Sequence, residues 1–225
     1  RTLTPVTRSA MDFTERSLRY LALSTLRPKK LVATAEVILE KAIPLFAGAG
    51  YAGVSMRVIG NAVGITQAAL YHHYPDKQSL YLAAMDHAFA DKAVGITDAL
   101  RSDGTPLERL ERFIKSFTKL MASDPDFRAL LQRELLDGDE IRLRLLAEQA
   151  FFEPFQAMME LARELAPDCD AHMAAISMAG LVLFHFETAP VRQFLPGGAK
   201  RHNDPKVVAR HVTRLLGQAF APARG

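Results

Sequence analysis

The sequence predicts an all-α fold, and three observations carry this prediction. Apolar residues recur every three or four positions along most of the 225-residue chain, as expected when one face of each helix is buried. The alternation of apolar and polar residues that marks a strand does not recur between turn residues. Ser, Thr or Asp precedes many of the apolar series and glycine follows several, which are ordinary start and stop signals of helices.

Composition narrows the class of protein. Apolar residues make up 49% of the chain, yet the longest apolar stretch, residues 174–184, is interrupted by Ser177 and too short for a membrane helix of roughly 18 residues. No secretory leader is visible and Cys169 has no second cysteine for a disulfide, so we expect a cytoplasmic protein. Because the sequence opens on Arg1 rather than Met, we expect that its start has been trimmed or replaced.

Positive charge is concentrated toward the N-terminus. Residues 1–80 hold 10 Lys plus Arg against 5 Asp plus Glu, a balance of +5, whereas residues 81–225 hold 18 against 20, a balance of −2. This asymmetry suits contact with a nucleic acid at one end of the chain. Residues 1–29 form an expected basic arm, in which Asp12 and Glu15 have the spacing to cap a short extra helix. The arm could reach DNA phosphates or a minor groove, or remain a solvated tail.

Three helices are predicted between residues 32 and 75. The first ends at two glycines, at positions 48 and 50, and Pro44 should bend its last turns. The second begins at Ser55, which caps it, and stops at Gly64. The third begins at Thr66, so only about three residues separate the two. Helices joined so tightly must cross steeply, and this is the geometry of a helix-turn-helix.

The remaining chain reads as longer helices that form a bundle. Pro75 and Asp76 end the third helix and cap a fourth that reaches about residue 99. A capping box at residues 105–108 starts the fifth helix. Further helices are expected over residues 125–136, 139–165, 171–187 and 205–219. We expect these side chains to face inward: Ile141, Leu145, Phe152, Phe155 and Met159 of the long helix, and Val208, Val212, Leu215 and Ala219 of the last.

The helix pair over residues 55–74 has the composition of a DNA-reading element. The second helix of a helix-turn-helix lies in the major groove, where small residues allow close approach and polar residues contact base edges or phosphates. Hydroxyls and helix starts can face phosphates, and aromatic rings at the far end of the helix can donate to them. The candidate DNA-binding residues are Ser55, Arg57, Thr66, Gln67, Ala68, Tyr71, His72, His73 and Lys77.

Residues 30–87 resemble the DNA-binding domain of the tetracycline-repressor (TetR) family of bacterial transcription factors. The matching pieces are Leu45-Phe46, Gly50-Tyr51, Ser55, Gly64, Leu70-Tyr71, His73-Tyr74 and Asp76-Lys77. Two positions depart from the family pattern. Pro44 lies where the family usually keeps a regular helix. Ala69 stands where threonine is more common, so one expected polar contact to DNA is missing and the base preference should differ. The resemblance implies a helix-turn-helix domain over residues 30–78 and a C-terminal helical bundle for ligand binding and dimerisation over residues 79–225.

The resemblance also implies a mode of action. It predicts a homodimeric repressor, without a cofactor, that binds a palindromic double-stranded DNA operator and is released by a small apolar or amphipathic effector. The last two helices would pack against their copies, and Ala174, Ser177 and Leu181 are expected to meet the partner. Candidate ligand-binding residues are Phe117, Met121, Phe151, Phe155, Met158, Met178 and His185, each of which could equally belong to the core or to an interface.

The same sequence bears on other classes of function. Adjacent His72 and His73 point about 100° apart on a helix and cannot easily hold one metal ion. Cys169 and His172 have ligand-like spacing, but acidic neighbours at a helix start are better explained as caps. A helical metal or haem enzyme is disfavoured, because the sequence has no paired Glu-x-x-His motifs and no glycine-rich phosphate loop. A further alternative stays open: a helical dimerisation protein that keeps the DNA-reading domain but binds no effector.

Overall fold

The computed structural model describes residues 29–220, and their side chains from residue 35 onward. The predicted basic arm lies almost entirely outside the described residues. The chain divides into two compact units, unit 1 over Arg1–Ala84 and unit 2 over Met85–Gly225. Every regular element within residues 29–220 is helical, so the predicted all-α class is confirmed.

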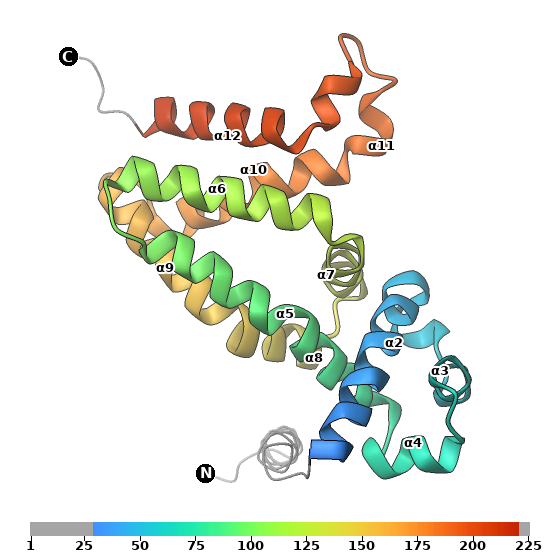
Figure 1. The fold of residues 1–225 in the computed structure, drawn as a ribbon. Helices are drawn as coiled ribbons and strands as arrows, with labels where there is room; N and C mark the ends of the chain where they lie inside the picture. The colour runs from blue at the N-terminus through green and yellow to red at the C-terminus, as the bar shows by residue number, and fades with distance from the viewer. Residues whose placement is uncertain (1–28, 221–225) are drawn as a thin grey trace, which may run out of the picture. The chain divides into compact units, whose positions relative to one another are not determined.

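Unit 1 is built on the helix-turn-helix pair. It contains α2 (Lys29–Gly53), α3 (Met56–Val63), α4 (Gln67–His73) and the first part of α5 (Lys77–Arg101) (Figure 1). The helical backbone of α2 breaks at Gly50, whose φ of 71° and ψ of 174° suit glycine alone. Pro44 lies inside α2, and its effect on the helix axis stays a prediction.

The predicted caps of the helix pair are confirmed. Ser55 Oγ accepts a hydrogen bond of 3.3 Å from the backbone N–H of Val58, and Thr66 Oγ1 accepts one of 3.2 Å from Ala69. Gly64 ends α3 in the left-handed conformation, with φ 80°, and its N–H donates to the Gly60 carbonyl. These local bonds define both ends of the turn between α3 and α4.

A small aromatic core supports this pair. Phe46 and Tyr81 meet edge to face with ring centroids 4.7 Å apart, and Tyr51 packs on Tyr81 at 5.1 Å. Ile59 of α3 and Leu70 of α4 are fully buried. Each such buried side chain contributes about 1.5–3 kcal/mol, so the inner faces of α3 and α4 are held in place and their outer faces stay free.

Unit 2 is a helical bundle. It contains the rest of α5, α6 (Pro106–Ser123), α7 (Pro125–Asp137), α8 (Glu140–Leu145), the π-helical segment η1 (Leu146–Phe151), α9 (Phe152–Leu165), α10 (Ala171–Glu187), α11 (Ala189–Arg192), the 3₁₀ turn η2 (Lys200–Asn203) and α12 (Pro205–Ala219). Helix α6 packs against α9, α10 and α12 (Figure 1). The capping box at its start is confirmed: Thr105 accepts from Glu108 N–H, and Glu108 accepts from Thr105 N–H.

The predicted single helix over residues 139–165 is wrong in its middle. The chain there forms α8, the π-helical turn η1 and then α9. Pro154 offers a physical reason, because it cannot donate to the carbonyl four residues earlier and its ring crowds that group. The wider turn changes which side chains face inward: Ile141 and Phe152, both predicted inward, are 47% and 52% exposed.

Helix α12 buries a different flank from the one predicted. Val208 and Val212 are buried as expected, but Leu215 is 43% exposed and Ala219 is also exposed. Leu216, only 4% exposed, takes the inward position instead. Both α6 and α10 pack on α12, so its buried stripe is centred nearer Leu216 than helical spacing alone suggested.

Helix α10 was expected to be covered on two sides. The prediction that Ala174 meets a partner subunit is wrong, because Ala174 is 8% exposed and buried within its own unit. Ser177 is exposed and Leu181 is half-buried, so both remain candidates for a second surface. Met173, Ile176 and Phe184 are 62%, 50% and 68% exposed and form an apolar outer face.

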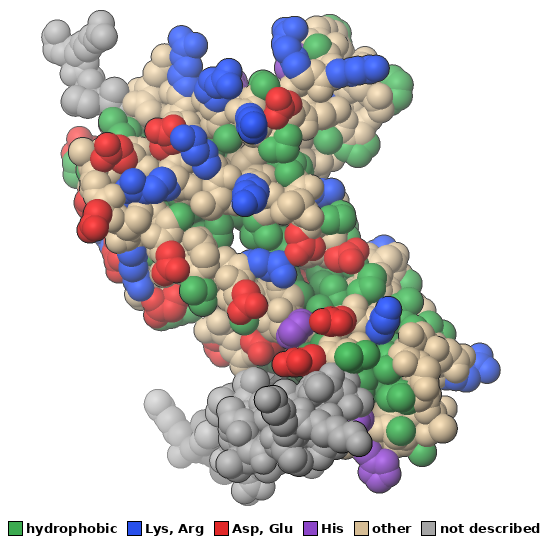
Figure 2. Space-filling model, viewed as in Figure 1, with side chains coloured by type: hydrophobic (Ala, Val, Ile, Leu, Met, Phe, Trp, Pro, Cys, Tyr) green, Lys and Arg blue, Asp and Glu red, His purple; other side chains and the backbone are tan. Residues whose placement is uncertain are grey.

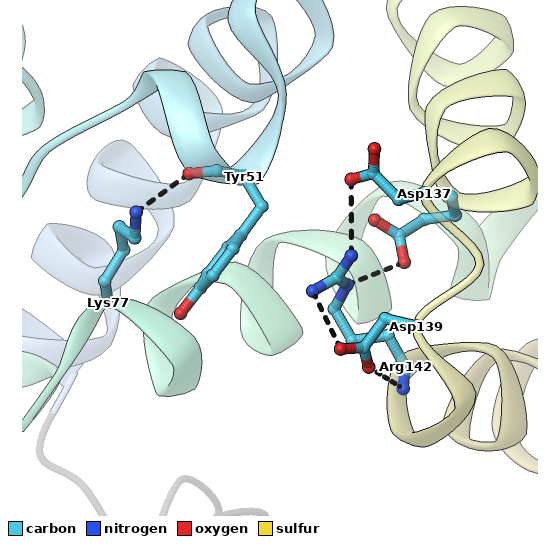
Figure 3. Close-up of polar contacts among 6 residues, drawn as sticks. Tyr51, Lys77, Asp137, Asp139 and Arg142 are labelled. Carbon is cyan, nitrogen blue, oxygen red and sulfur yellow. Dashed lines mark hydrogen bonds and ion pairs between the residues drawn. The ribbon is translucent and has the colours of Figure 1, made fainter.

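A buried ion-pair network closes the corner between α7 and α8. Arg142 Nε lies 2.9 Å from a carboxylate oxygen of Glu134, which is 1% exposed. The same guanidinium reaches Asp137 at 3.3 Å and Asp139 at 3.4 Å (Figure 3). Gly138, with φ 64°, forms the turn that brings these groups together. The sequence offered no signal for this network.

Candidate nucleic-acid interface

The outer face of α4 carries most of the predicted DNA-binding residues. Gln67, Ala68, Tyr71 and His72 are exposed and lie at helical spacing on one side of α4. Leu70, on the opposite side, is fully buried. The helix is therefore anchored by one face and presents the other, which Figure 2 shows as a surface with histidine side chains near α4.

Helix α3 also carries an exposed positive charge. Arg57 is exposed in the first turn of α3, two residues after the cap Ser55. Among the described side chains no acidic group pairs with Arg57, so its guanidinium can bind an external anion. Val58 and Asn61 are also exposed on α3 and were missed as candidates, although the spacing from Arg57 to Asn61 places them on one face.

The three rings at the end of α4 do not share one surface. Tyr71 is 44% exposed and His72 is exposed, so both can reach a ligand outside unit 1. His73 is half-buried and therefore partly engaged in packing. Within the part of the chain that the structure describes, no group of three or more His, Cys, Asp or Glu side chains is arranged to hold a metal ion.

Lys77 already has partners in unit 1. Its Nζ donates a 2.9 Å hydrogen bond to the backbone carbonyl of Tyr51 and lies 4.2 Å from the centre of the Tyr51 ring (Figure 3). This links the end of α2 to the start of α5. An ammonium group has three donors, so Lys77 can still reach a phosphate, but its packing role was missed.

The predicted ligand-binding residues are distributed over several neighbourhoods of unit 2. Phe117 stacks on Phe113 in α6, with centroids 5.7 Å apart. Phe151 packs on Phe89, and Phe155 packs on His172. The three methionines lie in the core: Met121 and Met178 are fully buried, and Met158 is 8% exposed.

His185 lies at the corner between α10 and α11. Arg192 donates to the His185 backbone carbonyl, and Arg192 Nη1 lies 3.3 Å from His185 Nδ1. The His211 ring packs edge to face at 5.6 Å. Burial lowers the pKa of His185, and the positive charges of Arg192 and His211 lower it further. A neutral His185 is a structural partner of Arg192.

No helix among residues 29–220 has the length and apolar content needed to cross a membrane.

The sequence is similar to those of known bacterial regulatory proteins. Residues 38–84 match the family model described as bacterial regulatory proteins, tetR family. The chain is 33% identical over 128 residues to the HTH-type transcriptional repressor AcnR of Corynebacterium efficiens, a match covering 52% of this chain and 66% of AcnR, just under two thirds. It is 22% identical over 165 residues to the HTH-type transcriptional activator FasR of Mycolicibacterium smegmatis, covering 72% of this chain and 70% of FasR.

A solved structure shares the fold over most of the chain. The crystal structure of AibR in complex with isovaleryl coenzyme A and operator DNA superposes with a TM-score of 0.65 at 23% identity. The superposition covers 81% of this chain and 97% of AibR. The match therefore extends well beyond the residues of the helix-turn-helix pair.

Proposed function

Since the chain belongs to the tetR family of bacterial regulatory proteins, we propose that it is a DNA-binding transcriptional regulator. The observation that carries this proposal is the outer face of α4, which stands exposed while Leu70 holds the opposite face in the core. The chain acts by binding rather than by catalysis. A regulator of bacterial genes works where the DNA is, in the cytoplasm.

The cap residues can serve DNA and helix at once. The Thr66 hydroxyl accepts from Ala69 N–H, which leaves its own proton free to be donated to a phosphate. Ser55 has the same arrangement at the start of α3, with Arg57 close by in sequence. We propose that these groups fix α4 in the major groove, where the Gln67 amide contacts base edges.

A symmetric dimer would present two such helices to a palindromic operator. Half-sites about one helical turn apart, roughly 34–36 Å, require two copies of α4 at that separation. The exposed apolar face of α10, with Met173, Ile176 and Phe184, supports a homodimer, because apolar surface of this kind commonly marks an interface.

We propose that an apolar or amphipathic effector binds within unit 2 among α6, α9 and α10. The aromatic and methionine side chains there supply an apolar, adaptable environment. Binding would favour a separation of the two α4 helices that no longer fits the operator. AibR binds isovaleryl coenzyme A, so acyl coenzyme A thioesters and free fatty acids are the first effectors to test.

Repression is the proposed direction of regulation. AcnR is a repressor whereas FasR is an activator, so both directions occur among the relatives of this chain. A reporter gene placed behind the operator, once selection from a random DNA pool has identified it, distinguishes the two directions. Reporter activity that falls when the protein is expressed supports repression, and activity that rises overturns it.

Selection of duplexes from a random DNA pool tests DNA binding directly. The expected product is a palindromic sequence, and Tyr71→Ala should weaken binding to it about tenfold or more while helicity is retained. Phe152→Ala is the matched control, because Phe152 is an exposed aromatic residue of unit 2 and should not affect DNA affinity. A pool that yields no preferred sequence, or equal effects of the two variants, would contradict the proposal.

A further inference from the structure

The connection between α10 and α12 exposes large apolar side chains. Val191 of α11 is 50% exposed, and Phe194 and Leu195 just after it are 79% and 53% exposed. Figure 2 shows hydrophobic side chains gathered at the α11 end of unit 2, beside Lys and Arg. Residues 193–199 carry no charge. An apolar tip this exposed is more typical of a surface that another molecule covers than of one facing water.

Arg192 holds this connection in a defined shape. Its Nη1 donates a 2.9 Å hydrogen bond to the His202 carbonyl, and its Nη2 donates to the His185 carbonyl. The guanidinium thus joins the end of α10 to the turn before α12. The exposed tip lies between the two carbonyls that Arg192 binds, so these hydrogen bonds fix the segment that carries it.

Two glycines complete the turn beyond Leu195. Gly197 has a φ of 76°, which favours glycine. A Cβ at Gly198 would lie 2.5 Å from the Arg192 carbonyl oxygen, too close for any side chain. The chain therefore reverses tightly at this point, with Phe194 and Leu195 on its outer side.

The exposed tip continues an apolar surface of α10. Met173, Ile176 and Phe184 lie at helical spacing along the outer face of α10, and Phe184 is in its last turn. The connection begins immediately after that turn, so the apolar surface runs from α10 toward the tip. A partner that covers the α10 face is the natural candidate to receive the tip as well.

We propose that Phe194 and Leu195 form a clasp that packs on a second copy of this chain, beyond the contact between α10 faces. The proposal rests on the homodimer of the proposed function. In a two-fold dimer the clasp of each copy packs on the equivalent surface of the other copy, so both tips become buried. Arg192 is a positioning residue, because it acts by fixing the segment that carries the clasp.

The dimer dissociation constant, measured by sedimentation velocity on a dilution series of the full chain, tests the clasp. Phe194→Ser should raise this constant about 100-fold, because two aromatic side chains are lost per dimer at about tenfold each. Phe152→Ser, which removes an exposed phenylalanine of α9, should change it less than about threefold. Equal constants for wild type and Phe194→Ser would overturn the proposal.

A double-mutant cycle tests the role of Arg192. Arg192→Gln alone should weaken the dimer, but in the Phe194→Ser background it should add little, since the clasp it positions is already lost. Fully additive effects would show that Arg192 stabilises the dimer without positioning the clasp and would overturn that role.

Two further measurements separate the proposals. Cosedimentation with phosphatidylglycerol vesicles that is lost in Phe194→Ser, with an unchanged dimer, would assign the tip to a lipid surface and overturn the clasp. DNA binding is measured at protein concentrations well above the dimer dissociation constants of the wild type and of Phe194→Ser, so that both are dimeric in this assay. Loss of the dimer in Phe194→Ser supports the clasp even if the wild-type chain binds no DNA, in which case only the proposed function fails.

Discussion

Replacing Arg57 with alanine should lower the salt dependence of DNA binding by a calculable amount. Arg57 is exposed at the start of α3 and, among the described side chains, has no acidic partner, so its charge is available to a phosphate. Each phosphate contact contributes about 0.9 to the slope of log affinity against log salt concentration. A dimer loses two such contacts, and the slope should therefore become shallower by about 1.8.

The same slope sets the expected loss of affinity. If the electrostatic contribution vanishes near 1 M salt, the wild type should bind about 200-fold more tightly than Arg57→Ala at 50 mM salt and about 30-fold more tightly at 150 mM. Fluorescence anisotropy with a labelled operator over this range measures both quantities. Arg144→Ala, which removes an exposed arginine of α8 in unit 2, is the matched control. An unchanged slope for Arg57→Ala would refute the phosphate contact.

Three other predictions follow from the contacts described. Lys77→Met should lower the free energy of unfolding of unit 1 by about 1–3 kcal/mol, because the contacts of the ammonium group with the Tyr51 carbonyl and ring are lost. Urea unfolding followed by circular dichroism measures this change, and unchanged stability would argue that Lys77 acts at the DNA alone. Arg142→Leu should lower the free energy of unfolding by about 3–5 kcal/mol, because the buried carboxylate of Glu134 loses this cation. Arg144→Leu should lower it by less than about 1 kcal/mol in the same assay, and equal losses for the two variants would contradict the buried pair. The pKa of His185 is lowered in the fold, so the unfolded chain binds more protons, and stability should fall as pH drops below about 6.5. His185→Gln should remove that part of the pH dependence, and identical profiles of stability against pH for variant and wild type would argue against this role of His185.

The helix-turn-helix could be predicted because its signals are local. The cap bonds of Ser55 and Thr66 each join residues three positions apart, and Gly64 closes α3 through its own left-handed backbone. Such contacts depend on neighbouring residues alone, so the sequence contains all the information they need. The exposed face of α4 followed from the same spacing.

Contacts between distant residues were not predictable in this way. Lys77 and Tyr51 are 26 positions apart, and their bond depends on how α2 and α5 pack. The π-helical turn before Pro154 rotated the neighbouring side chains, which is why Ile141 and Phe152 are exposed. A pattern that assumes a regular helix carries no information about such a turn.

The sequence by itself determined the helical class, the ends of most helices and the residues that α4 exposes to solvent. The tertiary structure alone decided which flank of an apolar helix is covered, as in α10, where Ala174 is buried and Phe184 is exposed. The physical reason is that helical spacing determines which side chains share a face, whereas the helices packed nearby determine whether that face meets protein or water.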